Sequence, residues 1–127
     1  MPNYMLLIYA PVEGGPSPEE LAEQSPRWDE YTQSLIDAGV HVGGERLAPL
    51  DAATTVRVRD DETLITDGPF ADTKEFLAGY YMVDCPDLDA ALAHAARMPA
   101  VAYGSVEVRP LYYAVAGQQA AAEPASA

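Results

Sequence analysis

The chain has 127 residues, of which 49% are hydrophobic and 21% are charged, a composition typical of one folded domain and not of a disordered chain. Its 20 acidic residues outnumber 7 Lys and Arg, and the net charge is −13. Because this field repels phosphate backbones and anionic lipids, we expect neither a nucleic acid nor a membrane as a partner. Cys85 has no second cysteine to pair with, and no signal or membrane segment is found in the sequence, so we expect a cytoplasmic protein.

The first third of the chain predicts a strand and a helix. Residues 4–9 are apolar at both alternating positions, which is typical of a strand that is covered on both faces. Residues 19–24 favour a turn or two of helix, but Pro26 is expected to interrupt it. The main helix should therefore begin at Ser25 as N-cap and end at Gly39.

A second strand and a hairpin follow. Residues 40–47 predict a strand in which the glycine pair at 43–44 indicates a bulge or a close backbone approach. Residues 54–59 alternate cleanly between apolar and polar, residues 60–62 are a polar turn, and residues 63–66 return as a strand. These three segments predict a β-hairpin inserted into the fold.

The last part of the chain predicts a strand, a helix and a final strand. After a loop over residues 67–75, residues 77–84 form a long strand, and Asp87 is expected to cap a helix that ends before Pro99. Leu88, Ala91, Leu92 and Ala95 should form its buried stripe, with His94 solvated on the opposite flank. Residues 106–111 give the last strand.

These elements predict an α+β fold of the ferredoxin-like βαββαβ type with an inserted hairpin, in one domain over residues 1–113. Residues 114–127 are expected to be a flexible tail. Both helices should cover one face of the sheet. The other face would then expose one set of apolar side chains from residues 4–9, and a second copy of the chain is the simplest cover. We therefore expect a homodimer.

Residues 67–75, which read DGPFADTKE, are the least ordinary stretch of the chain. Together with Ala-Gly at 38–39, Gly-Gly-Glu at 43–45 and GSVEVRP at 104–110, they strongly resemble the YCII-related family, in the branch named for its DGPF motif. The resemblance implies a dimeric α+β barrel of ferredoxin-like protomers. In the wider superfamily it implies small lyase-like enzymes that use a His-Asp pair, and it also suggests partners of extracytoplasmic-function sigma factors.

The motif has a structural and a functional interpretation. In the first, Asp67 caps a rigid Gly68-Pro69 turn that aims the next strand. In the second, the turn presents Asp67, Asp72, Lys74 and Glu75 to a pocket. Lys74, the only lysine, either forms a surface ion pair with Glu75 or anchors an anionic ligand.

Other candidate site residues come from neighbouring strands. His41 is the first candidate for a general base, because its side chain titrates near neutral pH, and an inert edge histidine is the alternative. Arg46 is a second candidate contact for an anion, and Tyr81, with Tyr80 and Trp28, is expected to line an apolar wall. Arg57 and Arg59 share one strand face and suit a salt network at the dimer interface. A reactive thiol at Cys85 is not favoured.

Three classes of function remain open. The first is a dimer that binds a small anionic metabolite, with a regulatory role linked to a sigma factor. The second is a lyase or isomerase without a cofactor, in which Asp67 and His41 perform acid-base chemistry. The third is an interaction module that has no pocket. No metal-ligand cluster or dinucleotide fingerprint is found in the sequence, so we expect neither a metal nor a cofactor.

Overall fold

The computed structural model describes residues 3–69 and 73–112. The candidate residue Asp72 and the expected tail over residues 114–127 lie outside them. The elements in chain order are β1 (Asn3–Pro11), α1 (Pro18–Asp37), β2 (His41–Arg46), the 3₁₀ turn η1 (Leu50–Ala52), β3 (Thr54–Arg59), β4 (Glu62–Asp67), β5 (Glu75–Asp84), α2 (Leu88–Ala96), the 3₁₀ turn η2 (Pro99–Ala102) and β6 (Ser105–Pro110).

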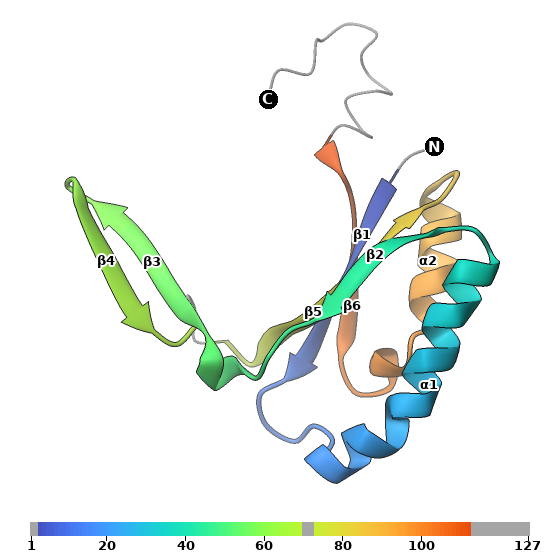
Figure 1. Cartoon of the computed structure of the whole chain (residues 1–127), viewed down its shortest axis with the longest axis horizontal. Coiled ribbons are helices and arrows are strands. Elements are labelled where there is room, and N and C mark those ends of the chain that lie inside the picture. The colour runs from blue at the N-terminus through green and yellow to red at the C-terminus, as the bar shows by residue number, and fades with distance from the viewer. Residues whose placement is uncertain (1–2, 70–72, 113–127) are drawn as a thin grey trace, which may run out of the picture.

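Four strands form an antiparallel sheet in the order β2-β5-β1-β6, and β3 and β4 form a separate two-stranded sheet. With the inserted hairpin set aside, this is the strand order of a ferredoxin-like βαββαβ unit, as the sequence predicts. Both helices lie on one side of the four-stranded sheet, and the hairpin extends from its other side (Figure 1).

Helix α1 differs from the prediction, because it is one helix of 20 residues instead of a short turn followed by a longer helix. Its N-cap is Ser17, not Ser25. The Ser17 side chain accepts a hydrogen bond from the Glu20 amide, and the Glu20 carboxylate accepts one from the Ser17 amide, which is a complete capping box. Pro26 lies inside the helix and costs it one backbone hydrogen bond, but the cap and the packed face keep the helix intact.

Helix α2 begins at the predicted cap, since the Asp87 carboxylate accepts a bond from the Ala90 amide. Its buried stripe was predicted correctly only for the two alanines. Ala91 and Ala95 are buried, whereas Leu88 and Leu92 are exposed. His94 is partly buried, with its Nδ1 3.0 Å from an Arg97 nitrogen, and is not fully solvated as predicted. The small Ala side chains let α2 lie close to the sheet, and the rest of the volume is filled by Met98 beyond the end of the helix.

The core lies between the helices and one face of the sheet. It consists of Tyr4, Leu6 and Ile8 of β1, Tyr31 and Leu35 of α1, Val83 and Cys85 at the end of β5, and Ala91, Ala95, Met98 and Ala100. The Tyr31 hydroxyl donates a 2.6 Å hydrogen bond to the His94 carbonyl, which joins the two helices. Burial is the main cause that raises the Tyr31 pKa to about 12. The same cause raises the pKa of the Cys85 thiol, with the Asp84 and Asp87 charges adding to it.

The opposite face of the sheet, which we call the open face, has an apolar centre. Met5 pairs with Met82 and Leu7 pairs with Tyr80, so these four side chains share this face. In the neighbouring strand β6, Glu107 and Arg109 occupy the same face and approach each other to 3.9 Å. The sequence leaves open which of the two alternating sets of β1 side chains faces away from the helices. In the structure, Met5 and Leu7 lie on the open face, and Tyr4, Leu6 and Ile8 lie in the core.

Candidate functional site

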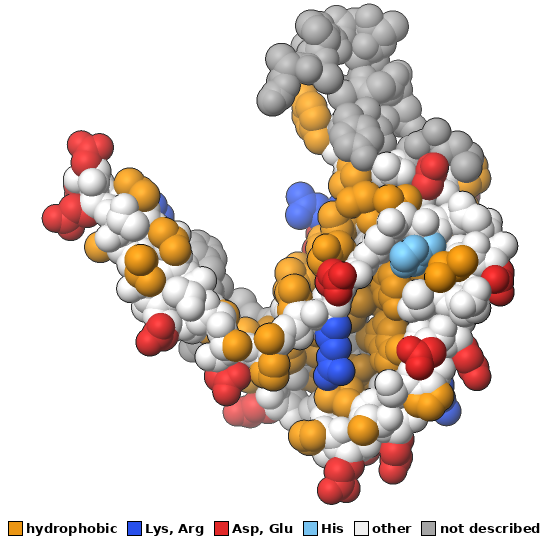
Figure 2. Space-filling view, viewed as in Figure 1, with side chains coloured by type: hydrophobic (Ala, Val, Ile, Leu, Met, Phe, Trp, Pro, Cys, Tyr) orange, Lys and Arg blue, Asp and Glu red, His pale blue; other side chains and the backbone are white. Residues whose placement is uncertain are grey.

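A cleft of about 530 Å³ lies where α1 and the loops before it face β2 and β5. Its walls come from elements far apart in the sequence, and they include Trp28 and Thr32 of α1, His41 and Arg46 of β2, Tyr81 of β5 and Tyr103 after η2. Its volume falls within the range of sites for small molecules. Figure 2 shows cationic side chains beside apolar ones on this face of the molecule.

Aromatic rings form one wall of the cleft. Trp28 and Tyr81 are nearly parallel, with an interplanar angle of 11° and centroids 6.4 Å apart, and the His41 ring meets Tyr81 edge-on at 6.2 Å. On the core side, Tyr31 packs edge-on against Tyr81 at 5.5 Å. Rings held at both faces and edges have little rotational freedom, so this wall is a preformed flat surface.

Two glycines on adjacent strands, one in β2 and one in β5, let the two backbones at the floor of the cleft lie close together. A Cβ added to Gly44 would lie 2.6 Å from the Tyr80 carbonyl oxygen, and one added to Gly79 would lie 2.8 Å from the Glu45 carbonyl oxygen. The register of β2 and β5 also shifts between His41 and Gly43. The predicted close approach and bulge at the glycine pair are both confirmed.

Arg46 supplies the positive charge of the cleft. Among the residues that line it, all of which belong to the described part of the chain, Arg46 is the one Lys or Arg, and two acidic residues, Asp29 and Glu45, line the cleft as well. Burial raises the pKa of Tyr103, and the positive charge of Arg46 opposes that rise because it favours the ionised form of the Tyr103 hydroxyl. His41 and Arg46 lie at opposite ends of β2.

The motif residues are placed elsewhere. Asp67 ends β4 and Gly68 has a φ of 101°, so the turn needs glycine there. The base of this turn is closed by two bonds, from the Gly68 amide to the Ala53 carbonyl at 2.7 Å and from the Thr55 hydroxyl to the Gly68 carbonyl at 2.9 Å. These two bonds hold the backbone of the turn, and the predicted cap by the Asp67 carboxylate is not part of either, so it stays a prediction.

Lys74 and Glu75 are exposed at the start of β5. The Lys74 carbonyl accepts a bond from the Val12 amide at 2.8 Å, and a Glu75 carboxylate oxygen lies 3.4 Å from the Ser105 hydroxyl. None of Asp67, Lys74 and Glu75 lines the cleft, so the structure does not bring Asp67 together with His41 there. A ligand contact at Lys74 or Glu75 stays a prediction from the sequence alone.

Of the candidate site residues, the cleft therefore brings together His41, Arg46 and Tyr81. Sequence reasoning missed Thr32 and Tyr103. Thr32 follows Trp28 by four residues on the same helix face, a spacing that could have identified it. Tyr103 lies in an irregular turn after η2, where no periodic pattern indicates which way a side chain points.

The described residues, 3–69 and 73–112, contain no group of three or more His, Cys, Asp or Glu side chains able to hold a metal ion. Within the same ranges, neither helix has the length and apolar character needed to cross a bilayer.

The sequence of this chain matches the model of one protein family. The family model of the YCII-related domain matches residues 3–114, most of the chain. An uncharacterized protein of Rhizobium meliloti (strain 1021) is 46% identical over 81 residues, which are 62% of this chain. The match spans 65% of that protein's own length, just under two thirds.

Proposed function

This chain belongs to the YCII-related family, and we propose that it is a dimer that binds a small carboxylate or enolate-like metabolite in the cleft between α1 and β2–β5. Arg46 binds the anionic group, and the wall of Trp28 and Tyr81 packs against the flat, apolar part of the ligand.

The observation that carries this proposal is the position of Arg46. In a chain with a net charge of −13, an anion must be attracted locally against the field of the whole protein. Arg46 provides that attraction at a cleft which also offers a flat aromatic wall. A guanidinium can bind both oxygens of one carboxylate at once, which favours a carboxylate over a spherical anion. The presence of the cleft also supports a binding function over an interaction module without a pocket.

Saturation-transfer NMR with a defined pair of probes tests the proposal. Benzoate and benzamide have the same size and shape, but only benzoate is charged. We expect signal transfer from the protein to benzoate and little to benzamide, and Arg46→Gln should remove the benzoate signal. Lys74→Gln is the matched control, because it also deletes one cation but outside the cleft. Loss of binding in Lys74→Gln with retention in Arg46→Gln would move the anion site to the DGPF segment.

The dimer is proposed to form through the open face. The apolar pairs Met5–Met82 and Leu7–Tyr80 are only half-buried, and both helices lie on the other side of the sheet (Figure 1). Two open faces packed about a two-fold axis would cover both and give the α+β barrel that the resemblance implies. Sedimentation equilibrium at micromolar concentration should show twice the 13.6 kDa mass of one chain.

A lyase or isomerase without a cofactor is the second candidate function, favoured by the position of His41 in the cleft. Its ring lies edge-on against the Tyr81 ring, where it could exchange a proton with a ligand that packs on the aromatic wall. Asp67 does not line the cleft, so the acid-base chemistry would depend on His41. Deuterium incorporation from D₂O into a bound keto acid such as phenylpyruvate, lost in His41→Gln, would establish this function.

Membership of the DGPF branch and a regulatory link to a sigma factor are proposed on the resemblance of residues 67–75 alone. Co-purification of an extracytoplasmic-function sigma factor with the intact chain tests the second proposal. A stable complex with defined stoichiometry is the expected result.

A further inference from the structure

We propose that the β3–β4 hairpin is an arm that packs against a second copy of this chain and buries its apolar face there. This inference rests on the proposed dimer and adds a second contact to it. The apolar face consists of Val56, Val58 and Ile65. Val56 and Ile65 are directly opposite each other in the hairpin register, and Val58 is two residues further along the same strand face.

The apolar side chains of the hairpin are more exposed to solvent than is usual for a stable two-stranded ribbon. The exposed fractions of Val56, Val58 and Ile65 are 60%, 58% and 69%. Strands β3 and β4 contact each other extensively, and neither forms an extensive contact with another described element. A two-stranded hairpin is marginally stable at best in water, so an ordered ribbon with one apolar face needs a surface to pack on.

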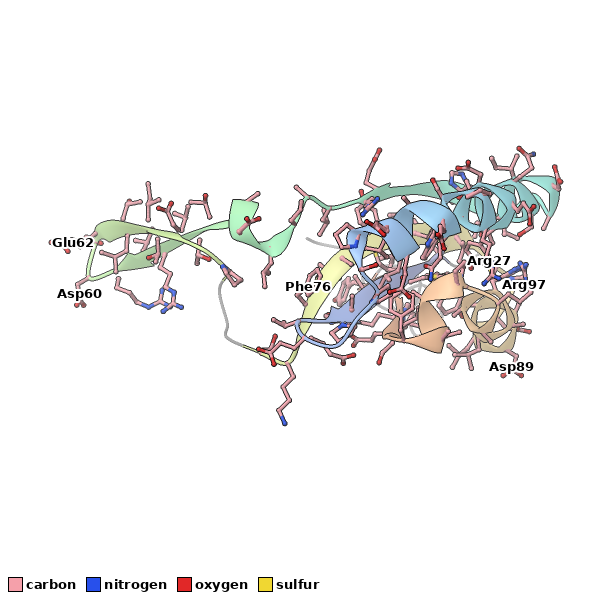
Figure 3. The ribbon with its side chains drawn as sticks, turned by 90° about the horizontal axis from the view of Figure 1, so that it is seen from below. Arg27, Asp60, Glu62, Phe76, Asp89 and Arg97 are labelled. Atoms are coloured by element: carbon pink, nitrogen blue, oxygen red, sulfur yellow. The ribbon has the colours of Figure 1, made fainter. Side chains whose placement is uncertain are left out.

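The direction of the hairpin identifies that surface. It leaves the four-stranded sheet on the side opposite the helices, so the hairpin and the open face enclose an angle (Figure 1). Its tip residues, Asp60 and Glu62, lie at the far end of the molecule from Arg97 (Figure 3). Apolar side chains are visible on both sides of this angle (Figure 2). A second copy seated on the open face would occupy the angle, and its own hairpin would reach back by symmetry.

Charge complementarity also favours a second copy as the occupant. The other face of the hairpin has Arg57 and Arg59, which are two of only seven Lys and Arg in the chain. A second copy has a net charge of −13, and two acidic protomers repel each other less when cations lie near their contact. Arg57 and Arg59 lie on the face that turns away from the buried one, so they reduce this repulsion from the rim of the contact and not from inside it.

The test replaces the cross-strand pair Val56 and Ile65 with Val56→Lys and Ile65→Glu together. The net charge is unchanged, and the two new side chains lie opposite each other, where an ion pair keeps the hairpin paired. We expect the dimer dissociation constant, measured by sedimentation equilibrium, to rise about tenfold or more. Circular dichroism of the variant should match that of the unchanged chain.

A spin label reports the contact directly. Thr63 lies on the apolar face opposite Val58, and Cys85 is buried, so Thr63→Cys gives one reactive thiol. The label should be immobile in the dimer and become mobile on dilution to the monomer, while a control label at the exposed Glu23 of α1 stays mobile throughout. A dimer with a mobile Thr63 label and an unchanged dissociation constant in the double variant would overturn the arm but keep the dimer. A monomer at all concentrations would overturn both.

Discussion

The hydroxyls of Thr32 and Tyr81 lie 2.6 Å apart, and this hydrogen bond joins the middle of α1 to β5 beside the cleft. Tyr81 is held by the same bond against Trp28 and Tyr31. The orientation of the aromatic wall is therefore fixed by a polar contact as well as by packing.

Removal of this bond should destabilise the protein measurably. Tyr81→Phe keeps the ring and deletes the hydroxyl, which leaves the partly buried Thr32 hydroxyl without this partner, at a cost of about 1 kcal/mol in the free energy of unfolding. Thr32→Val deletes the other half of the pair. In urea unfolding, the double variant should cost less than the sum of the two single ones. Strict additivity would show that the two hydroxyls do not interact.

The two adjacent glycines of β2 should respond very differently to alanine. A Cβ at Gly44 would lie 2.6 Å from the Tyr80 carbonyl oxygen, so the backbone of β2 or β5 must shift, and Gly44→Ala should cost about 1–3 kcal/mol. A Cβ at Gly43 would meet nothing within 4 Å. Gly43→Ala is therefore the matched control and should leave the urea midpoint nearly unchanged. Equal effects at the two positions would contradict the close approach of the strands.

The order and type of the main elements could be predicted from the sequence, because each has a local signal. The alternation over residues 54–59 and the acidic turn after it define the hairpin, whose turn residues Asp60 and Asp61 have positive φ. The start of α1 was mispredicted because Pro26 is a strong local signal, whereas the stability of a helix depends on its cap and its packed face as well.

The candidate site could be predicted only in part. His41, Arg46 and Tyr81 lie on strands whose pairing brings them to one side of the sheet, and this follows from the fold. The placement of Lys74 does not follow, because a loop residue next to a motif has no periodicity that indicates its direction. Lys74 is the only lysine of the chain, but the rarity of a residue type carries no information about where its side chain lies.

His94 should make stability depend on pH. Burial, and then the charge of Arg97, lowers its pKa below the ordinary value of 6.5, and its Nδ1 lies 3.0 Å from an Arg97 nitrogen. As the pH falls below 6.5, the unfolded chain takes up a proton at His94 before the folded chain does, so stability falls toward the folded pKa. Above 6.5 both states are neutral at this residue and its contribution no longer changes.

The comparison with His94→Gln isolates this contribution from that of the 20 acidic residues. We expect the stability of the unchanged chain relative to His94→Gln to be lower at about pH 5 than at about pH 8, measured by urea unfolding. A difference between the two proteins that is the same at both pH values would show that the folded chain does not resist protonation of His94.

Titration of the fluorescence of Trp28 tests the anion-binding cleft most directly. Trp28 is the only tryptophan, and it forms the aromatic wall that a ligand would contact. We predict that benzoate changes Trp28 emission to saturation, that benzamide does not, and that the benzoate response is lost in Arg46→Gln and kept in Lys74→Gln. An equal response to both probes, or a benzoate response that survives in Arg46→Gln, would contradict the proposal that Arg46 binds an anion in this cleft.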